Sequence, residues 1–563
     1  MPDDTYDAIV VGSGITGGWA AKELTEKGLR TLVIERGRAV EHGKDYVTEW
    51  LQPWEIPHRG RGERDLYARD YPIQSKNYAF GETTRHFFVS DREHPYITDG
   101  PHEFRWIRGY HLGGRSLLWG RASWRWSDLD FAANAADGHG VDWPIRYKDL
   151  APWYDHVERF VGISGENLGL PHLPDQQLLP GWEMNCAESF VKKGLERAFP
   201  GRHLTMTRVA NLTRAHQGRG QCQARNQCAR GCSYGAYFSS LSSTLPAARA
   251  TGRLTVVTDA IVESVIYDEK RDRVSGVRVI DAKTKQSREY SGRLVFLNAS
   301  TIGTAQILLN SKSSRFPNGL ANSSGEVGHN LMDHLSKAGA HGRVPGFEED
   351  YYYGRRPTGT YTPRFRNLRP GESAKLGFLR GYGVQSGAGR AGWDRGISSP
   401  GIGTALKASL REPGPWGMSM QGYVECLPRH ENHISLGETK DAWGIPLVNI
   451  RWSWSDNEKA AREDMKTQCA EMLAAGGCTD VQTYDNDAPM GFSVHEMGTA
   501  RMGRDPKTSV LNAHNQAHDV PNLFITDGAC MASSSCVNPS LTYMALTARA
   551  VDHAVSEINR RNL

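Results

Sequence analysis

The sequence has little net charge and no long apolar run. Its 67 basic and 63 acidic side chains are interspersed and sum to +4 over 563 residues. That balance gives no electrostatic reason to expect a nucleic acid or an anionic membrane as a partner. No window approaches the roughly 18 apolar residues that a membrane-spanning helix needs, and the mean hydropathy is −0.53. We therefore expect a chain without a direct membrane span whose partners include small molecules.

Cysteine is scarce, and the first residues lack the pattern of an export signal. The chain holds nine cysteines. Its start, MPDDTYDAIVVGSG, enters an apolar run without the basic, apolar and cleavage regions of a signal peptide. We therefore expect synthesis in the cytoplasm. A structural disulfide network is not expected in that reducing compartment.

Three of the nine cysteines are nevertheless crowded together. Cys222, Cys228 and Cys232 lie in GQCQARNQCARGCSYGAYFSS, residues 219–239. Their spacing matches neither the usual zinc pairs nor the four-cysteine ferredoxin pattern. Three thiolates suit a 3Fe-4S cluster, in which each iron takes one terminal ligand. The alternative is a loop with three free thiols.

The amino-terminal segment predicts a dinucleotide site. YDAIVVGSGITGGWAAKELTEKGLRTLVIERG reads as strand, tight turn, helix and strand, and Gly12, Gly14 and Gly17 fit GxGxxG. The first glycine permits the turn, the second lets the backbone approach a pyrophosphate, and the third lets helix and strand pack closely. Glu35 ends the second strand, where its carboxylate suits a ribose and repels a 2′-phosphate. FAD and NAD both fit this pattern.

The carboxyl-terminal segment predicts a second contact with the same cofactor. Leu541, Met544 and Ala548 begin an apolar stripe at helical spacing, and Asn538 and Pro539 suit the cap and the first position of that helix. The amino end of a helix favours an anion such as a reduced flavin. A predicted strand at 523–526 precedes Asp527 and Gly528, which suggest a further cofactor contact.

His495, in HEMGTARMG, lies about forty residues before Asn538. Beside a flavin, a histidine and an asparagine suit alcohol oxidation, with His495 as general base and Asn538 holding the same oxygen. A lone histidine is more often structural, so this pattern alone does not assign the role.

Six motifs in order resemble the glucose-methanol-choline (GMC) oxidoreductases, FAD-dependent enzymes that oxidise alcohols and sugars. They are VVGSGITGG with Glu35-Arg36, YHLGGRSLLWGRAS, DWPIRYKDLAPWY, LNASTIGTAQILLNS, HEMGTARMG, and NLFITDGA with NPSLT. The resemblance covers nearly the whole chain. It implies FAD as cofactor and makes His495 and Asn538 the catalytic pair.

The resemblance also implies further site residues. Leu118 stands where a related branch has a flavin-linking histidine, so noncovalent FAD is expected. Asp333 and His334 are expected to be hinge or flavin-domain residues. The implied cofactor contacts are Gly12, Gly14, Gly17, Glu35, Arg36, Gly113, Gly114, Ser116, Val262, Ala299, Asp527, Gly528, Asn538 and Pro539.

The expected fold is α/β, or α+β overall, with a Rossmann-like FAD-binding domain interleaved with a substrate domain on an antiparallel sheet. The FAD-binding parts are expected at 1–170 (with long loops at 39–109), 206–340 (with the cysteine-rich insertion) and 491–563. The substrate-domain parts are expected at 171–205 and 341–490.

The cysteine-rich stretch is similar to the insertion of bacterial FAD-dependent glucose dehydrogenases and glycoside 3-dehydrogenases. This likeness implies a 3Fe-4S cluster on Cys222, Cys228 and Cys232, with Arg225 and Arg230 near its sulfurs. It also implies a c-type cytochrome or other electron acceptor, and a small chaperone-like subunit whose export signal would carry the chain to the periplasm. Without such a subunit, residence in the cytoplasm is expected.

Aromatic and amide side chains in the second half suit sugar binding, and Gln421, Glu425 and Trp416 are candidate substrate contacts. Each is more often structural at such positions. The expected function is an FAD-dependent dehydrogenase that oxidises a secondary pyranose hydroxyl, most readily at C3, with electrons leaving through the cluster. The alternatives are an oxidase that produces hydrogen peroxide with idle cysteines, and a redox-silent sugar-binding subunit that retains FAD.

Overall fold

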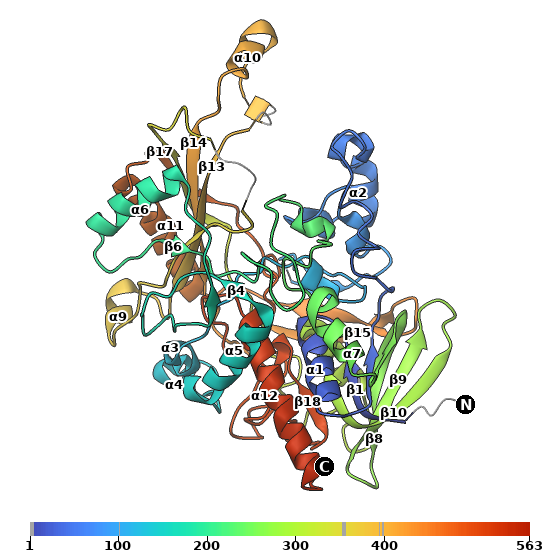
Figure 1. Ribbon diagram of the computed structural model, residues 1–563. Coiled ribbons are helices and arrows are strands. Elements are labelled where there is room, and N and C mark those ends of the chain that lie inside the picture. The colour runs from blue at the N-terminus through green and yellow to red at the C-terminus, as the bar shows by residue number, and fades with distance from the viewer. Residues whose placement is uncertain (1–4, 101, 352–355, 393–394, 397–398) are drawn as a thin grey trace.

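The computed structural model describes residues 5–100, 102–351, 356–392, 395–396 and 399–563. Two sheets dominate it (Figure 1). One lies with both chain termini, and the other lies at the opposite end of the molecule. No helix of the described ranges has the length and apolar character needed to cross a membrane.

The first sheet is built on parallel strands. In spatial order they are β7 (Leu254–Val257), β2 (Thr31–Ile34), β1 (Thr5–Val11), β10 (Ser287–Leu297) and β18 (Leu523–Ile525). The first half of β10 also pairs with the antiparallel strand β9 (Arg273–Asp281), and β9 in turn pairs with β8 (Ala260–Asp268). Because the amino-terminal and carboxyl-terminal strands both join β10, distant parts of the sequence form one domain.

The predicted strand, turn, helix and strand are β1, α1 (Ile15–Glu26) and β2. Gly28 follows α1 with φ +93°, a conformation that favours glycine after a helix. Helix α12 (Ser540–Asn559) packs against α1 and α5 (Tyr147–Val161). It begins one residue later than predicted, because Pro539 is its cap and Asn538 precedes that cap. This shift frees the Asn538 side chain from capping the helix.

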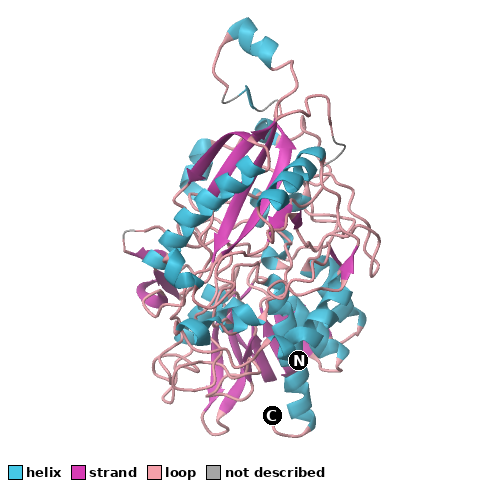
Figure 2. Ribbon diagram, turned by 90° about the vertical axis from the view of Figure 1, so that its left-hand side faces the viewer, coloured by secondary structure: helices cyan, strands magenta, loops and turns pink. Residues whose placement is uncertain are grey.

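The second sheet is antiparallel. Its order is β17 (Thr479–Asp485), β11 (Ala338–Val344), β14 (Trp416–Val424), β13 (Tyr382–Arg390), β12 (Thr360–Thr362) and β6 (Thr205–Met206). Helices α11 (Asp456–Ala475) and α6 (Cys186–Ala198) pack against it (Figure 2). Met418 and Met420 of β14 are buried in that core, whereas Gln421 and Tyr423 alternate with buried neighbours.

A third, small sheet joins segments that were expected in different domains. It consists of β15 (His433–Lys440), β16 (Pro446–Arg451) and β3 (Ile97–Asp99), and β15 packs against α8 (Thr301–Asn310) of the FAD-binding part. Part of 341–490 therefore contacts the FAD-binding half. The consecutive strands β14 and β15 belong to two different sheets.

Shorter elements complete the described chain. The helices are α2 (Arg64–Asp70), α3 (Asp128–Phe131), α4 (Ala133–Asp137), α7 (Leu245–Ala250), α9 (Glu372–Leu376) and α10 (Gly403–Ser409), and the remaining strands are β4 (Ile163–Ser164) and β5 (Leu178–Leu179).

Candidate active site

A long cavity runs along the carboxyl ends of β1 and β2, and it contains about 1670 Å³ of empty space including its open mouth. Its walls come from every part of the chain that was expected to bind the cofactor. The predicted contacts that line it are Gly12, Gly14, Glu35, Arg36, Gly114, Ser116, Val262, Ala299, Asp527 and Gly528. Leu118, the position compared with a flavin-linking histidine, lines it as well.

The three glycines of the turn have three different environments. A Cβ at Gly17 would lie 1.9 Å from the Gly12 carbonyl oxygen, and one at Gly12 would lie 2.3 Å from the Asn298 carbonyl oxygen. A Cβ at Gly14 would meet no described atom within 4 Å. Gly12 and Gly17 are therefore needed for packing, whereas Gly14 keeps space open in the cavity at the start of α1.

Hydrogen bonds join this turn to the loop that follows Leu112. The Glu35 carboxylate accepts from the Ser13 Oγ (2.5 Å) and from the Gly37 amide (2.9 Å). Ser13 Oγ in turn accepts from the Gly113 amide at 2.9 Å. Gly113 has φ +85° and does not itself line the cavity, whereas its neighbour Gly114 does. The loop is thereby held over the glycine turn.

Polar atoms on the cavity wall lack partners within the described protein. The Tyr543 hydroxyl and the Arg36 Nε are buried without a hydrogen bond, and both residues line the cavity. The first turn of α1 has no side-chain cap. Together with the open space at Gly14, these features fit a dinucleotide with a pyrophosphate at the α1 terminus. Glu35 and Arg36 would then lie at its adenosine end, near Val262.

The predicted catalytic pair is brought together beside this cavity. The Asn538 Nδ2 lies 3.1 Å from the His495 Nε2. Val494 and Glu496, which flank His495, line the cavity, as does Ser540. Pro539 itself does not line it. The two side chains that were expected to hold one substrate oxygen are thus adjacent, although 43 residues separate them.

His334 lies on the other side of His495, which sequence reasoning did not foresee. The two Nδ1 atoms are 2.9 Å apart, and the His334 Nε2 lies 2.9 Å from the Ser535 carbonyl oxygen. Burial lowers the pKa of His334 to about 4. Burial, followed by the neighbouring His334 and Arg115, lowers the pKa of His495 well below its ordinary value. Both imidazoles are therefore neutral at neutral pH.

Asp333 binds the backbone around His495, and Arg115 pairs with the carboxylate of the neighbouring Glu496. The Asp333 carboxylate accepts from the backbone amides of Gly491, Ser493 and His495. Burial, and then the nearby Glu496, raises the pKa of Asp333 to about 7. Arg115 forms a two-point ion pair with Glu496, at 2.8 and 3.1 Å. Asp333 thus holds the backbone around His495, whereas its neighbour His334 contacts the side chain of the predicted catalytic pair.

The substrate-domain sheet meets the catalytic pair through amide and aromatic side chains. Gln385 of β13 donates from Nε2 to the Asn538 Oδ1 at 2.8 Å. Gln421 lies opposite Gln385 in the β13–β14 register, and its Nε2 is 3.4 Å from the Tyr423 hydroxyl. The Tyr423 ring centre is 5.9 Å from that of His495. Gln421 is therefore near the site as predicted, and Gln385 was missed because no motif marks it.

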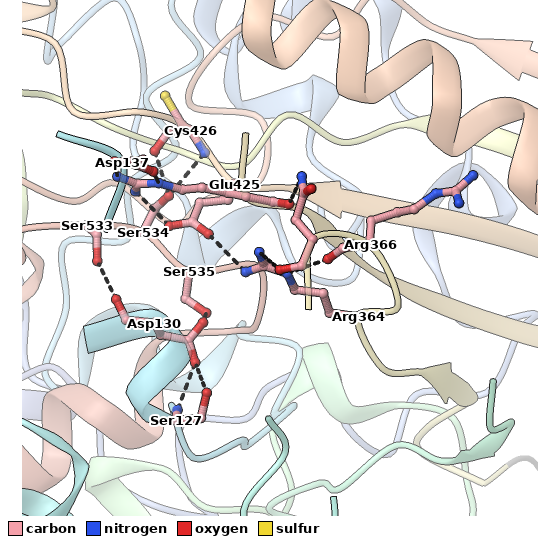
Figure 3. A network of polar contacts seen from close by, with 12 residues as sticks. Ser127, Asp130, Asp137, Arg364, Arg366, Glu425, Cys426, Ser533, Ser534 and Ser535 are labelled. Carbon is pink, nitrogen blue, oxygen red and sulfur yellow. Dashed lines mark hydrogen bonds and ion pairs between the residues drawn. The ribbon is translucent and has the colours of Figure 1, made fainter. Parts of the chain in front are cut away.

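Glu425 does not face the catalytic pair. It is 1% exposed, and its Oε1 binds the Arg380 Nη1 at 2.8 Å. Figure 3 shows it in a polar network that reaches the loop before Asn538, where Ser534 bonds to the backbone of Cys426. The expectation of a substrate contact at Glu425 is corrected to a structural role. Trp416 is also excluded, because its ring is buried in the core under α11.

The three crowded cysteines lie in a loop attached to the cavity wall. Their thiols are partly buried, and burial followed by the charges of the neighbouring cysteines raises the pKa of Cys232 and Cys222. Tyr237, a few residues further on, donates from its hydroxyl to the Leu117 carbonyl at 3.1 Å. Because Leu117 precedes the cavity-lining Leu118, the loop and the cofactor cavity share one wall.

Comparison with known proteins agrees with this architecture. The family model of the GMC oxidoreductases matches residues 6–336 and 428–547. The chain is 28% identical to the 2-methyl-1,2-propanediol dehydrogenase of Mycolicibacterium austroafricanum over 98% of this chain and 95% of that protein. It is 27% identical to the fructose dehydrogenase large subunit of Gluconobacter japonicus over 98% of each.

A solved structure shares the fold at lower identity. The crystal structure of pyridoxine 4-oxidase from "Mesorbium loti" superposes with a TM-score of 0.59 and 16% identity, over 97% of this chain and 98% of that chain. With the cavity and the family match over most of its length, the chain belongs to the GMC oxidoreductases, FAD-dependent enzymes that act on the CH–OH groups of alcohols and sugars.

Proposed function

We propose that this enzyme is a dehydrogenase that oxidises a secondary hydroxyl of a pyranose or glycoside. The observation that carries the proposal is the His495–Asn538 contact beside the cavity. Gln385, Gln421 and Tyr423 of the substrate-domain sheet lie next to this pair. C3 is the proposed position, giving a 3-keto glycoside, on the likeness of the cysteine loop to that of glycoside 3-dehydrogenases.

The catalytic pair can act on one alcohol oxygen. A substrate hydroxyl can replace the direct contact between Asn538 and His495, accepting a hydrogen bond from Asn538 Nδ2 and donating its proton to His495 Nε2. FAD, when bound, supplies the acceptor for the hydride that leaves the carbinol carbon. Asn538 then holds the oxygen as it becomes a carbonyl. The lowered pKa of His495 keeps its imidazole neutral before the substrate binds, so one ring nitrogen is free to accept the proton.

The side chains around the pair favour a polyhydroxylated substrate. Gln421 and Tyr423 place amide and phenol groups on the strand next to Gln385. Such groups hydrogen-bond hydroxyls, and an aromatic ring can lie against the C–H face of a sugar. The relative named fructose dehydrogenase large subunit is consistent with a sugar substrate.

Cys222, Cys228 and Cys232 are the proposed ligands of a 3Fe-4S cluster. Thiolates are the donors that iron–sulfur clusters take. Burial, and then the charge of the neighbouring Cys228, raises the pKa of Cys222 and of Cys232, so the three thiols lie near one another. Arg225 lies beside Cys232 and pairs with the buried Glu49. A cluster there would supply a one-electron exit next to the flavin cavity, which favours a dehydrogenase over an oxidase.

The surface beside the cysteine loop supports an electron-accepting protein partner, such as a c-type cytochrome. Trp50, Trp54 and Tyr234 are 57%, 78% and 40% exposed, and the Arg225 guanidinium lies over the rings of Trp50 and Tyr234. Residues 213–235 include no acidic residue, and three of their arginines (Arg214, Arg225 and Arg230) are at least partly exposed. An apolar patch with a basic rim suits a partner with an acidic rim. The chaperone-like subunit expected from the resemblance, and with it a periplasmic location, is proposed on that likeness.

Iron and labile sulfide analysis, with electron paramagnetic resonance of anaerobically purified protein, tests the proposal. A three-iron signal that disappears when a glucoside is added supports the route from sugar to cluster. Cys228→Ser should remove the signal, whereas the matched variant Cys469→Ser, which changes a buried cysteine of the substrate domain, should keep it. Iron-free protein that is still reduced by sugar and releases peroxide in air would favour the oxidase alternative.

The position of oxidation is tested separately by identifying the product of a panel of glucosides by NMR. A 3-keto product supports the C3 assignment. Oxidation at another carbon would overturn that assignment and leave the sugar dehydrogenase proposal intact.

A further inference from the structure

Gln385 is the one member of the substrate-domain sheet that bonds directly to a catalytic side chain in the described structure. It comes from β13, 153 residues before Asn538, and its Nε2 donates to the Asn538 Oδ1 at 2.8 Å. The carboxamide of Asn538 therefore has both ends engaged, because its Nδ2 faces His495. A side chain of the other domain thus holds the oxygen end of this carboxamide.

Hydrogen bonds connect the Ser535 carbonyl, His334, His495, Asn538 and Gln385 in that order. Their donors and acceptors can be assigned by starting from Ser535. The Ser535 carbonyl can only accept, so the His334 Nε2 carries a proton. Neutral His334 then has its lone pair on Nδ1, and the His495 Nδ1 must be the donor to it. Neutral His495 consequently has its lone pair on Nε2. That lone pair faces a donor, the Asn538 Nδ2.

We propose that Gln385 is a positioning residue that holds the Asn538 carboxamide in this orientation and thereby keeps the basic lone pair of His495 on Nε2. The inference rests on the proposed role of His495 as general base. Gln385 need not touch the substrate. The Ser535 carbonyl can only accept at one end of these hydrogen bonds, and the Gln385 amide donates to the Asn538 Oδ1 at the other, so both ends agree with a lone pair on the His495 Nε2.

Replacing Gln385 by the isosteric glutamate should reverse the direction of the hydrogen bonds that reach His495. In Gln385→Glu the carboxylate can only accept, so Asn538 must turn its Nδ2 toward residue 385 and present its Oδ1 to His495. His495 then needs a proton on Nε2 while its Nδ1 still faces the lone pair of His334. Both requirements are met when His495 is an imidazolium, which the new carboxylate also stabilises.

None of the other charged and titratable groups described around His495 favours its imidazolium form. Burial, the neighbouring His334 and Arg115 all disfavour the imidazolium. Tyr423 packs against the ring, and Asp333 binds the His495 backbone amide. Glu496, the nearest carboxylate on the same segment, is paired with Arg115. A new carboxylate at position 385 is therefore the one change that favours a charged His495.

The test compares Gln385→Glu with Gln385→Met, which keeps the length of the side chain and removes the donor. Anaerobic flavin reduction by a glucoside is measured from pH 6 to pH 10. The Met variant should slow reduction by roughly tenfold, since one oriented hydrogen bond is lost. The Glu variant should slow it by roughly a hundredfold or more at pH 7, as for a lost general base, and regain rate as pH rises.

Ser419→Asp, on β14, is the control for a carboxylate elsewhere on the exposed positions of the sheet. It should leave the pH profile of flavin reduction unchanged. A Glu variant that is as fast as the Met variant at every pH, or whose profile matches the unmodified enzyme, would overturn the proposal, because a packing role predicts that the isosteric residue is tolerated better.

A second readout needs no turnover. The absorbance of the bound flavin responds to charge beside it. Asp333 titrates near pH 7 in every variant, so the resting Glu variant should show a second titration between pH 6 and pH 10 that the Met variant lacks. Absence of that titration in a flavin-loaded Glu variant would also overturn the proposal. If no sugar or alcohol reduces the unmodified enzyme, the proposed function fails, and this titration still decides the role of Gln385.

Discussion

Replacing Glu425 by glutamine separates a structural role from a substrate contact. Its carboxylate is 1% exposed and binds Arg380 at 2.8 Å, with Arg364 at 3.9 Å. Arg380 is itself buried and has Asp137 as its other carboxylate partner, at 2.8 Å. The Glu425→Gln change would leave two buried arginines with one carboxylate fewer. We expect the folded protein to lose stability and the residual folded enzyme to keep its affinity for substrate.

The magnitude follows from the geometry. Breaking a buried ion pair by removing one partner costs about 3–5 kcal/mol. Asp137 continues to compensate Arg380, so the lower end, about 3 kcal/mol, is expected. For a cooperative unit of 150–250 residues each kcal/mol lowers the midpoint of thermal unfolding by about 2–4 °C, which gives a decrease of roughly 6 °C or more.

The assay is thermal unfolding of the flavin-loaded protein, followed by the KM of the active fraction. Glu289→Gln is the matched control, because Glu289 forms an exposed pair with Arg278 at 3.0 Å. Exposed pairs contribute about 1 kcal/mol or less, so this control should barely change the midpoint.

Two results would refute the reasoning. One is an unfolding midpoint of Glu425→Gln equal to that of the Glu289→Gln control. The other is a raised KM with an unchanged unfolding midpoint. That result would show that Glu425 contacts the substrate and that the structural assignment is wrong.

Three further outcomes are expected. His495→Ala should slow anaerobic flavin reduction by roughly a hundredfold or more without loss of bound FAD, since a general base is removed; unchanged single-turnover reduction would contradict its role. Gly14→Ala should leave the FAD-free fold as stable as before, because its Cβ meets no described atom within 4 Å, yet weaken FAD retention measured by dialysis; full retention would place the pyrophosphate elsewhere. Burial lowers the pKa of His111 to about 4, so on acidification the unfolded chain binds this proton before the folded protein does. The free energy of unfolding therefore falls as pH decreases from about 6.5 toward 4, by roughly 2 kcal/mol at pH 5. His111→Asn should make the urea midpoint less sensitive to pH in that window; an unchanged pH dependence of the midpoint would show that His111 is not the group responsible.

The cofactor half could be predicted because its signals are local. The strand, turn and helix around Gly12, Gly14 and Gly17 form from adjacent residues. The tight turn brings Gly17 against the Gly12 carbonyl, where only glycine fits. The residue types at His495 and Asn538 are equally plain in the sequence. Their contact agrees with the expectation, although a helix start shifted by one residue was needed to free Asn538 from a capping role.

Other features depended on how distant segments pack. His334 was expected to be structural, yet it contacts His495 across 161 residues, and Gln385 reaches Asn538 from another domain. Glu425 and Gln421 are both polar residues of one short segment, and the sequence does not distinguish them. In the structure Glu425 follows β14 directly and lies in a buried ionic network with Arg380.

The sequence by itself determined the fold class and the cofactor turn, because both depend on short spacings along the chain, and it indicated the proposed catalytic pair through its resemblance to a family. Only the tertiary structure decided which nitrogen of His495 carries the lone pair. That property follows from the direction of hydrogen bonds among side chains of four separate segments, and such a direction exists only after those segments have packed together.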